Sequence, residues 1–221
     1  MKTLGVHQLQ KKKFKVNETD GEWKEHLGDI PNGFVGIIYG DPGNGKTEYS
    51  IRLAKYVTRF DKVGWLSYEQ GHGADLQMAL KRNNMSEVNG KFFIVDPLEK
   101  RKRSMSLVEE LDEYLSRRSC PPFVFVDSLD YLRMTTEEYF DLKEKHGKRR
   151  RIFFLSHANG NEPKSRTGKD IMYDGMVGIF VKRFIAYPKK NRLGGIEDYI
   201  IWEEEARKRN ALYFKKKENA E

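Results

Sequence analysis

The residues from position 40 to position 47 have the composition and spacing of a phosphate-binding loop (P-loop). Glycines let backbone amides wrap around phosphate oxygens where a Cβ would clash, and a following helix points its positive end at the same oxygens. We expect Lys46 to reach the β and γ phosphates of a nucleotide and the Thr47 hydroxyl to ligate Mg²⁺. A glycine-rich turn with a chance lysine is the alternative, which the apolar run before the loop and the helical pattern after it disfavour. The expected nucleotide-binding residues are Gly40, Asp41, Pro42, Gly43, Asn44, Gly45, Lys46, Thr47 and Glu48.

Two acidic residues, each placed after a predicted strand, complete the chemistry that a P-loop needs. Asp127 ends an apolar run, and we expect it to hold the Mg²⁺ shell together with Thr47. A turn or helix-capping aspartate is the alternative for this position. Hydrolysis also needs a group that polarises the attacking water. Ser128 stands directly after Asp127, so a second acid is missing there and this general base must come from another segment. Glu69 follows the apolar run 63–67, whose end should share the P-loop edge of the sheet, although a surface glutamate also fits.

Short apolar runs rich in valine, isoleucine and phenylalanine alternate with helical patterns from Phe34 onward. This alternation predicts an α/β domain with a mostly parallel central sheet flanked by helices. Runs of this length fit strands that are buried on both faces. The predicted strands are residues 34–39, 62–67, 91–95, 122–126 and 151–155, and the predicted helices are residues 46–59, 107–118 and 136–145.

The pattern changes after residue 155. The stretch 156–169 is polar and contains Gly160, Pro163 and Gly168, which predicts a loop. Apolar runs follow, and Gly194-Gly195 suits a turn among them. We therefore expect a C-terminal cluster of hairpin-linked antiparallel strands at residues 176–181, 184–187 and 196–202.

Length and charge set the wider limits. The 221 residues fit one domain, for which we expect a polar leader at 1–30, the nucleotide-binding domain at 31–210 and a basic flexible tail at 211–221. The net charge is +8, with basic runs at 11–13, 100–103, 148–151 and 215–217. This favours nucleic acid as a partner, although each run by itself also fits a solvated surface.

No segment has the roughly 20 apolar residues that cross a bilayer, and the first residues lack an apolar signal-peptide core. We therefore expect a cytoplasmic protein without membrane contact. Cys120 is the only cysteine, so an intrachain disulfide is excluded and a reducing compartment fits.

The order of the motifs resembles the RecA-like ATPases, the superfamily that includes RecA, archaeal RadA, the DnaB-type replicative helicases and KaiC. The resemblance implies a single RecA-like P-loop domain over residues 34–202 that binds ATP and Mg²⁺. It implies that Glu69 is the catalytic base and that His157 senses the γ phosphate, although a histidine that ends a strand is often structural. The matching pieces are Gly40 to Thr47, Ser67-Tyr68-Glu69, Val126-Asp127-Ser128 and Leu155-Ser156-His157.

The segment from Ala158 to Lys169 matches the loop that contacts single-stranded DNA in this superfamily. Its glycines, amide donors and cations suit phosphates. It contains no aromatic residue for base stacking, which favours contact with the DNA backbone, and an ordinary solvated loop is the alternative. The residues expected to bind nucleic acid are Asn159, Asn161, Lys164, Arg166 and Lys169.

Lys190 and Arg192 resemble the lysine-x-arginine strand end of DnaB-type helicases, where such residues reach the nucleotide of a neighbouring subunit. The resemblance implies that both act in trans and that the protein works as a homo-oligomeric ring or filament. A basic hairpin turn is the alternative.

These features together predict an ATP-hydrolysing protein that binds DNA in recombination, repair or replication. In size it is similar to single-domain recombination ATPases of some phages and mobile elements. The alternative is an ATP-dependent regulatory or helicase-loader-like protein that acts on a protein partner. A small-molecule or nucleotide kinase fits less well, because it would need an acceptor-binding lid and the hairpin-linked strands expected after Met176 fit that need poorly.

Overall fold

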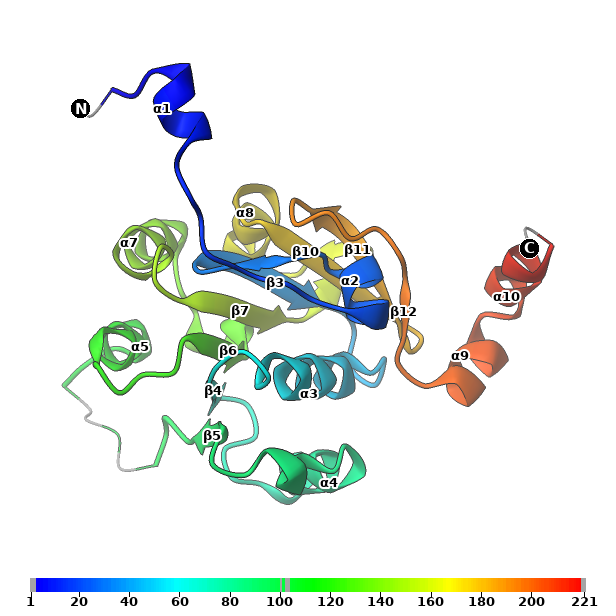
Figure 1. Cartoon of the computed structure of the whole chain (residues 1–221). Helices are drawn as coiled ribbons and strands as arrows, with labels where there is room; N and C mark the ends of the chain where they lie inside the picture. The colour runs from blue at the N-terminus through cyan, green and yellow to red at the C-terminus, as the bar shows by residue number, and fades with distance from the viewer. Residues whose placement is uncertain (1–2, 100, 102–103, 220–221) are drawn as a thin grey trace.

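The computed structural model describes residues 3–99, 101 and 104–219. An eight-stranded sheet with the order β12-β11-β10-β3-β7-β6-β4-β5 forms the centre of the molecule (Figure 1). The strands from β10 to β5 in this order run parallel, and β11 and β12 are antiparallel additions at one edge. The bounds are β3 Phe34–Tyr39, β4 Val63–Ser67, β5 Phe92–Val95, β6 Phe123–Asp127, β7 Arg151–Ser156, β10 Val177–Lys182, β11 Ile185–Asn191 and β12 Tyr199–Ile200.

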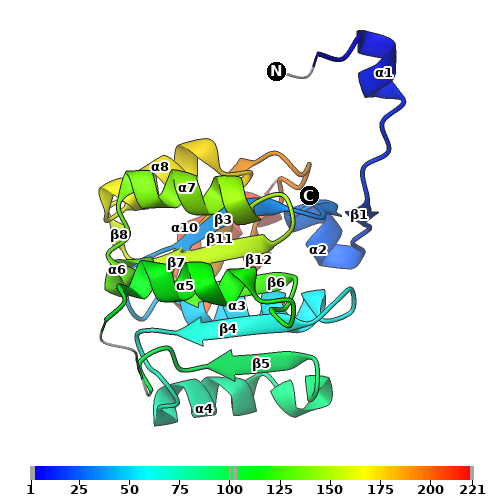
Figure 2. The same ribbon diagram turned by 90° about the vertical axis from the view of Figure 1, so that its left-hand side faces the viewer.

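Helices cover both faces of the sheet (Figure 2). Along β3, Phe34 and Ile38 pack with the core on the α3 and α4 side, whereas Val35 and Ile37 pack with the core on the α5, α7 and α8 side. This alternation follows from the two-residue period of a strand and explains why the run is apolar throughout. The helices are α3 Lys46–Val57, α4 Ala74–Arg82, α5 Leu107–Ser116, α6 Leu129–Leu132, α7 Thr136–His146 and α8 Arg166–Asp174, with a 3-10 helix at Met85–Val88.

Part of the expected polar leader packs into the domain. The helix α1 (Val6–Gln10) buries no residue and projects from the body in Figure 1. In contrast, α2 (Gly21–His26) buries Trp23, whose ring stacks on Tyr199 with centroids 4.5 Å apart. The short strands β1 (Val16–Asn17) and β2 (Ile30–Pro31) pair beside it. The apolar residues here are too scattered to give a periodic signal, because their partners are distant in the sequence.

The segment expected to be a loop at 156–169 is a hairpin followed by a helix, which corrects that prediction. Strands β8 (Ala158–Asn159) and β9 (Glu162–Pro163) pair, and α8 then begins. The Ser165 hydroxyl caps this helix by accepting a hydrogen bond from the Gly168 amide at 3.0 Å. Glycine and proline gave the segment a loop-like composition, but the capping serine starts a helix whose Ile171 is fully buried.

The C-terminal antiparallel strands are confirmed, with two differences from the expected layout. The tight turn between β10 and β11 is Arg183-Phe184, and both residues have positive φ (50° and 62°). Gly194 also has positive φ, but it lies in the longer connection from β11 to β12. Two helices follow, α9 (Glu203–Arg209) and α10 (Ala211–Glu218). The segment expected to be a flexible tail is therefore helical up to residue 218, and the side chain of Phe214, which is 5% exposed, packs α10 against the domain. Residues 220–221 of the expected tail lie outside the described part of the chain.

Two arginines of the basic run 148–151 are used inside the fold. Arg150 donates hydrogen bonds to backbone carbonyls in the segment 115–120. Arg151 is 6% exposed and donates to the Pro31 carbonyl at 3.0 Å. These cations therefore stabilise the fold and are not free for a polyanion. In the run 100–103, only residue 101 lies within the described residues. Among the described residues, no helix is long and apolar enough to span a bilayer.

Candidate nucleotide-binding site

The P-loop joins the end of β3 to the start of α3, which is the expected strand, loop and helix order. Its glycines are required by geometry at two places. A Cβ on Gly40 would lie 2.2 Å from the Val181 carbonyl oxygen. Gly45 has a φ of +95° and precedes the first turn of α3, so a side chain there would be strained. The free amides of this helix start point into the loop and suit an anion.

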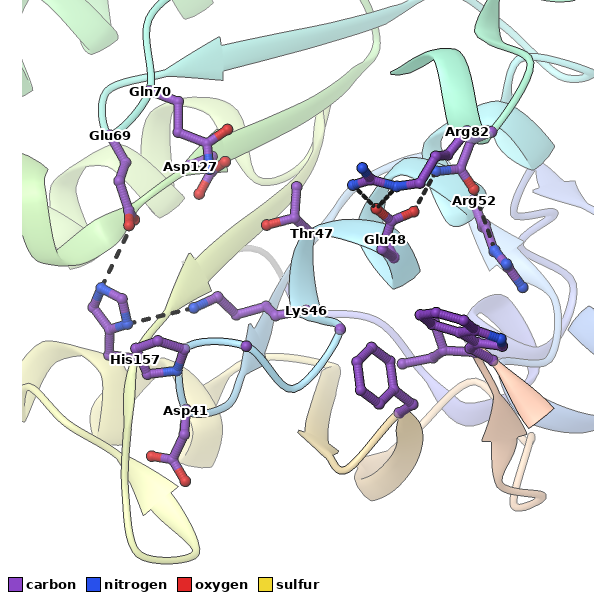
Figure 3. Close-up of a pocket in the computed structure, with 17 residues that line it drawn as sticks. Asp41, Lys46, Thr47, Glu48, Arg52, Glu69, Gln70, Arg82, Asp127 and His157 are labelled. Atoms are coloured by element: carbon purple, nitrogen blue, oxygen red, sulfur yellow. Dashed lines mark hydrogen bonds and ion pairs between the residues drawn. The ribbon is translucent and has the colours of Figure 1, made fainter. Parts of the chain in front are cut away.

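A cavity of about 830 Å³ opens beside this loop at the carboxyl end of the parallel strands (Figure 3). The structure brings most of the expected site residues to its wall. Gly40 and Asn44 belong to the same loop but do not line the cavity; the Asn44 side chain instead accepts a hydrogen bond from the Arg183 amide at 2.7 Å. The expected residues that do line it are Asp41, Pro42, Gly43, Gly45, Lys46, Thr47, Glu48, Glu69, Asp127 and His157.

Asp127 is the most deeply buried acid of this wall, with an exposure of 2%. Burial, reinforced by the neighbouring Glu69 carboxylate and opposed by the Lys46 ammonium, raises the pKa of Asp127 to about 7. Its Oδ2 atom is buried and has no hydrogen-bond partner among the described residues. An unpaired buried carboxylate oxygen is costly unless a cation meets it. Together with the Thr47 hydroxyl on the same cavity, this oxygen fits the hard oxygen ligands that Mg²⁺ prefers.

Lys46, His157 and Glu69 form a chain across the cavity (Figure 3). The Lys46 ammonium donates to His157 Nδ1 at 3.5 Å, and His157 Nε2 lies 3.7 Å from Glu69 Oε2. The Glu69 amide in turn donates to the Asp127 carbonyl at 3.0 Å. Burial lowers the pKa of Lys46, and the surrounding carboxylates, Asp127 first, oppose that shift. The cation, the acid and the histidine are therefore held within reach of one bound group.

The far wall of the cavity was not found from the sequence. Phe184, Ile201 and Trp202 form an apolar surface, and the Trp202 and Phe184 rings meet edge to face at 5.6 Å. Trp202 is 51% exposed, which is unusual for a tryptophan and leaves its ring open to a ligand. Arg52 and Arg82 also line the cavity, and Arg82 forms an ion pair with Glu48. Arg52 lies on α3 itself, the helix that follows the P-loop. The other residues reach the cavity from the β10–β11 turn, from the chain after β12 and from α4, so no spacing signal links them to the P-loop.

Lys190 and Arg192 do not reach this cavity. Lys190 pairs with Gly178 near the start of β10, whereas the P-loop follows the opposite end of the neighbouring parallel strand β3. The Lys190 ammonium donates to the Tyr173 carbonyl, and Arg192 is exposed. A role of these cations at a neighbouring subunit stays a prediction.

The residues expected to bind nucleic acid lie on the hairpin, on the short connection that follows it (Lys164) and on α8, and none of them lines the cavity. Two of the cations have acidic partners: Lys169 contacts Glu162 at 2.5 Å, and Arg166 lies 3.7 Å from Asp170. A second hollow of about 330 Å³ lies beside them. Its wall includes Tyr39, Asn161, Lys169, Tyr173 and Lys189.

Comparison with solved structures finds the same arrangement of elements elsewhere. A KaiC-like protein of the hyperthermophilic archaeon Pyrococcus horikoshii matches with a TM-score of 0.62 and 16% identity, over 84% of this chain and 94% of that one. The flagellar accessory protein FlaH of Methanocaldococcus jannaschii matches with a TM-score of 0.60 and 15% identity, over 83% of this chain and 91% of that one. No family model and no curated protein sequence matches the chain. At these identities the likeness shows the fold alone.

Proposed function

Because the chain has the RecA-like P-loop ATPase fold, we propose that it binds ATP with Mg²⁺ and hydrolyses it. One observation carries this proposal. Lys46, Asp127 and Glu69 come from segments far apart in the sequence, yet they meet around one cavity with the P-loop. Structural ion pairs do not require a phosphate-sized space between them, whereas phosphoryl transfer does. The proposal assigns each side chain a separate task.

Lys46 and the loop amides bind the phosphates and offset the negative charge that develops on them. Thr47 and Asp127 would hold Mg²⁺, which when bound supplies further charge stabilisation at the phosphates. Glu69 orients a water and accepts its proton. His157 contacts both Lys46 and Glu69. A group that binds between those two side chains would therefore displace His157 and the segment that follows it. The aromatic pair Phe184 and Trp202 offers a face on which a base can stack.

The test is a steady-state hydrolysis assay beside a nucleotide-binding assay. We expect Glu69→Gln to lose turnover by about 100-fold or more and to keep its affinity for ATP, because a general base contributes roughly 10²–10⁴-fold. Lys46→Ala should lose both binding and turnover. Glu99→Gln removes an exposed carboxylate outside the cavity and serves as the matched control. Near-normal turnover in Glu69→Gln would rule out the assigned base, and a wild-type protein that binds no ATP would refute the proposed function.

Binding of single-stranded DNA is the second function that we propose. The observation that favours it is the exposed position of the Tyr173 side chain. This side chain is 72% exposed and lines the hollow that also contains Asn161, Lys169 and Lys189. The sequence segment 158–169 has no aromatic residue, but α8 brings this one beside it. An exposed ring between cations is the usual platform for an unpaired base. The proposed role is recombination, repair or replication, with the active form an assembly of several copies.

A labelled oligonucleotide at low salt tests this second function. We expect Tyr173→Ala to weaken the complex by about 10-fold, since base stacking contributes roughly 1–3 kcal/mol, and Tyr173→Phe to keep it. Tyr131→Ala is the control, because Tyr131 is 50% exposed but lies outside the hollow. If no complex forms and DNA leaves hydrolysis unchanged, DNA binding is refuted. The alternative then remains, in which the ATP-bound protein acts on a protein partner. The likeness to a KaiC-like protein and to a flagellar accessory protein is compatible with that alternative.

A further inference from the structure

Asp130 lies next to the nucleotide cavity without lining it. It belongs to α6, the short helix after the strand that ends in Asp127. Leu129 and Leu132 are buried at 2% and 3% exposure and fix this helix against the sheet. The Asp130 side chain is thereby held beside the end of β7, the strand that precedes His157.

The Asp130 carboxylate bonds to the backbone of the residue that spans the cavity. Its Oδ2 atom accepts from the His157 amide at 2.7 Å and from the Ser156 hydroxyl at 3.1 Å. Hydrogen bonds to an ionised acceptor are shorter and stronger than neutral ones. The His157 carbonyl is fixed as well, because it accepts from the Lys164 amide at 2.9 Å across the hairpin. Both sides of the His157 backbone are thus held, one by Asp130 and one by the hairpin.

The His157 ring contacts two side chains of the cavity wall. The ring reaches Lys46 on one side and Glu69 on the other, at 3.5 and 3.7 Å. These contacts are long, so a small rotation of the backbone breaks them or moves the ring out of line. An error of about 1 Å in the position of a catalytic group can cost roughly 100-fold in rate.

We propose that Asp130 is a positioning residue for ATP hydrolysis, which holds the His157 backbone so that its ring stays between Lys46 and Glu69. The inference rests on the proposed function, and it adds a residue that the P-loop, the metal ligands and the base do not include. The Asp130 carboxylate also favours the charged form of Lys46, whereas its positioning effect passes through the His157 backbone. Removing it therefore changes turnover more than nucleotide binding, and the effect disappears when the His157 ring is absent.

A double-mutant cycle on the hydrolysis rate tests this dependence. We expect Asp130→Ala to lower kcat by roughly 10- to 100-fold with KM nearly unchanged. Asp130→Asn keeps an acceptor for the His157 amide and should retain most of the rate. In a His157→Ala background, Asp130→Ala should lower kcat by no more than about twofold, because coupled residues are not additive. Additive losses, or an Asp130→Asn variant as slow as Asp130→Ala, would overturn the proposal.

A second measurement needs no hydrolysis and separates this inference from the proposed function. The ring-proton NMR signals of His157 can be assigned by their loss in His157→Ala. In the wild-type background we expect Lys46→Ala to shift these signals, since the two side chains are in contact. In the Asp130→Ala background the same substitution should leave them unchanged. A shift of equal size in both backgrounds would refute Asp130 as the positioning residue even if the protein proved not to hydrolyse ATP.

Discussion

Replacing Asp127 with asparagine removes a deeply buried carboxylate whose burial should make the free protein less stable at high pH. The side chain is 2% exposed, its Oδ2 atom has no hydrogen-bond partner among the described residues, and burial raises its pKa from 3.8 to about 7. Between these two values the folded protein binds a proton that the unfolded chain has lost. The free energy of unfolding therefore falls as the pH rises through this window, and it becomes flat above pH 7.

The size of the effect follows from the shift. One pKa unit corresponds to about 1.36 kcal/mol, so charging Asp127 between about pH 5.5 and about pH 7 costs about 2 kcal/mol. Other groups titrate in the same range and cancel only in a comparison with Asp127→Asn, whose side chain is neutral throughout. We expect the stability of the wild type, minus that of Asp127→Asn, to fall by about 2 kcal/mol from about pH 5.5 to about pH 8.5. Urea titrations of the free proteins at the two pH values give this difference.

Mg²⁺ with ATP provides the second half of this experiment. If Asp127 is a metal ligand, adding both at high pH should restore stability to the wild type and leave Asp127→Asn nearly unaffected. Asp141→Asn is the control, because Asp141 is an exposed acid outside the cavity. Wild-type and Asp127→Asn stabilities that stay parallel across the pH range would refute the assignment of a buried, unpaired charge. Equal stabilisation of both proteins by Mg²⁺ and ATP would refute the metal role.

Three further changes test other parts of the structure. Trp202→Ala should weaken ATP binding by about 10-fold and Trp202→Phe should retain it, because stacking contributes roughly 1–3 kcal/mol; a fluorescent-nucleotide titration measures both. If Lys190 and Arg192 act on a neighbour, the Lys190→Ala/Arg192→Ala protein mixed with Glu69→Gln protein should hydrolyse ATP faster than the two separate rates added together; a simple sum would count against action in trans. Burial lowers the pKa of His26 to about 4, so the unfolded chain takes up this proton first as the pH falls. Relative to His26→Gln, the wild type should lose about 3 kcal/mol of stability between about pH 6.5 and about pH 4, and urea titrations that show no such loss would contradict the burial of a neutral imidazole.

The central strands and the P-loop were predictable because their signals are local. A strand buried on both faces is apolar along most of its length, so β3, β4, β6 and β7 stand out as runs. The P-loop needs glycines where its backbone crowds Val181 or takes positive φ, and these positions are fixed by the loop itself. In such segments the residue and the reason for it lie within a few positions of each other.

Predictions from composition were wrong where the contact that fixes a side chain is with a residue distant in the sequence. The start of helix α8 was expected to be part of a loop, because the segment contains a glycine and a preceding proline. The capping serine and the buried isoleucine favour a helix only when the sheet is present for the isoleucine to pack against. Arg150 and Arg151 contributed to the expected polyanion surface, yet their donors bond to carbonyls of the fold. Trp23 lay in an apparently polar leader, and its stacking partner Tyr199 is far away in the sequence.

The sequence by itself therefore determined the nucleotide loop, the buried strands and the acids at the strand ends, since parallel strands place their carboxyl ends at one edge. Only the tertiary structure decided which further residues line the cavity. Phe184 and Trp202 reach the cavity because β10, β11 and the chain after β12 fold back onto the P-loop. Asp130 reaches the His157 amide because α6 packs beside β7. These contacts depend on how helices and strands pack against one another, and the spacing of residues along the chain does not specify that packing.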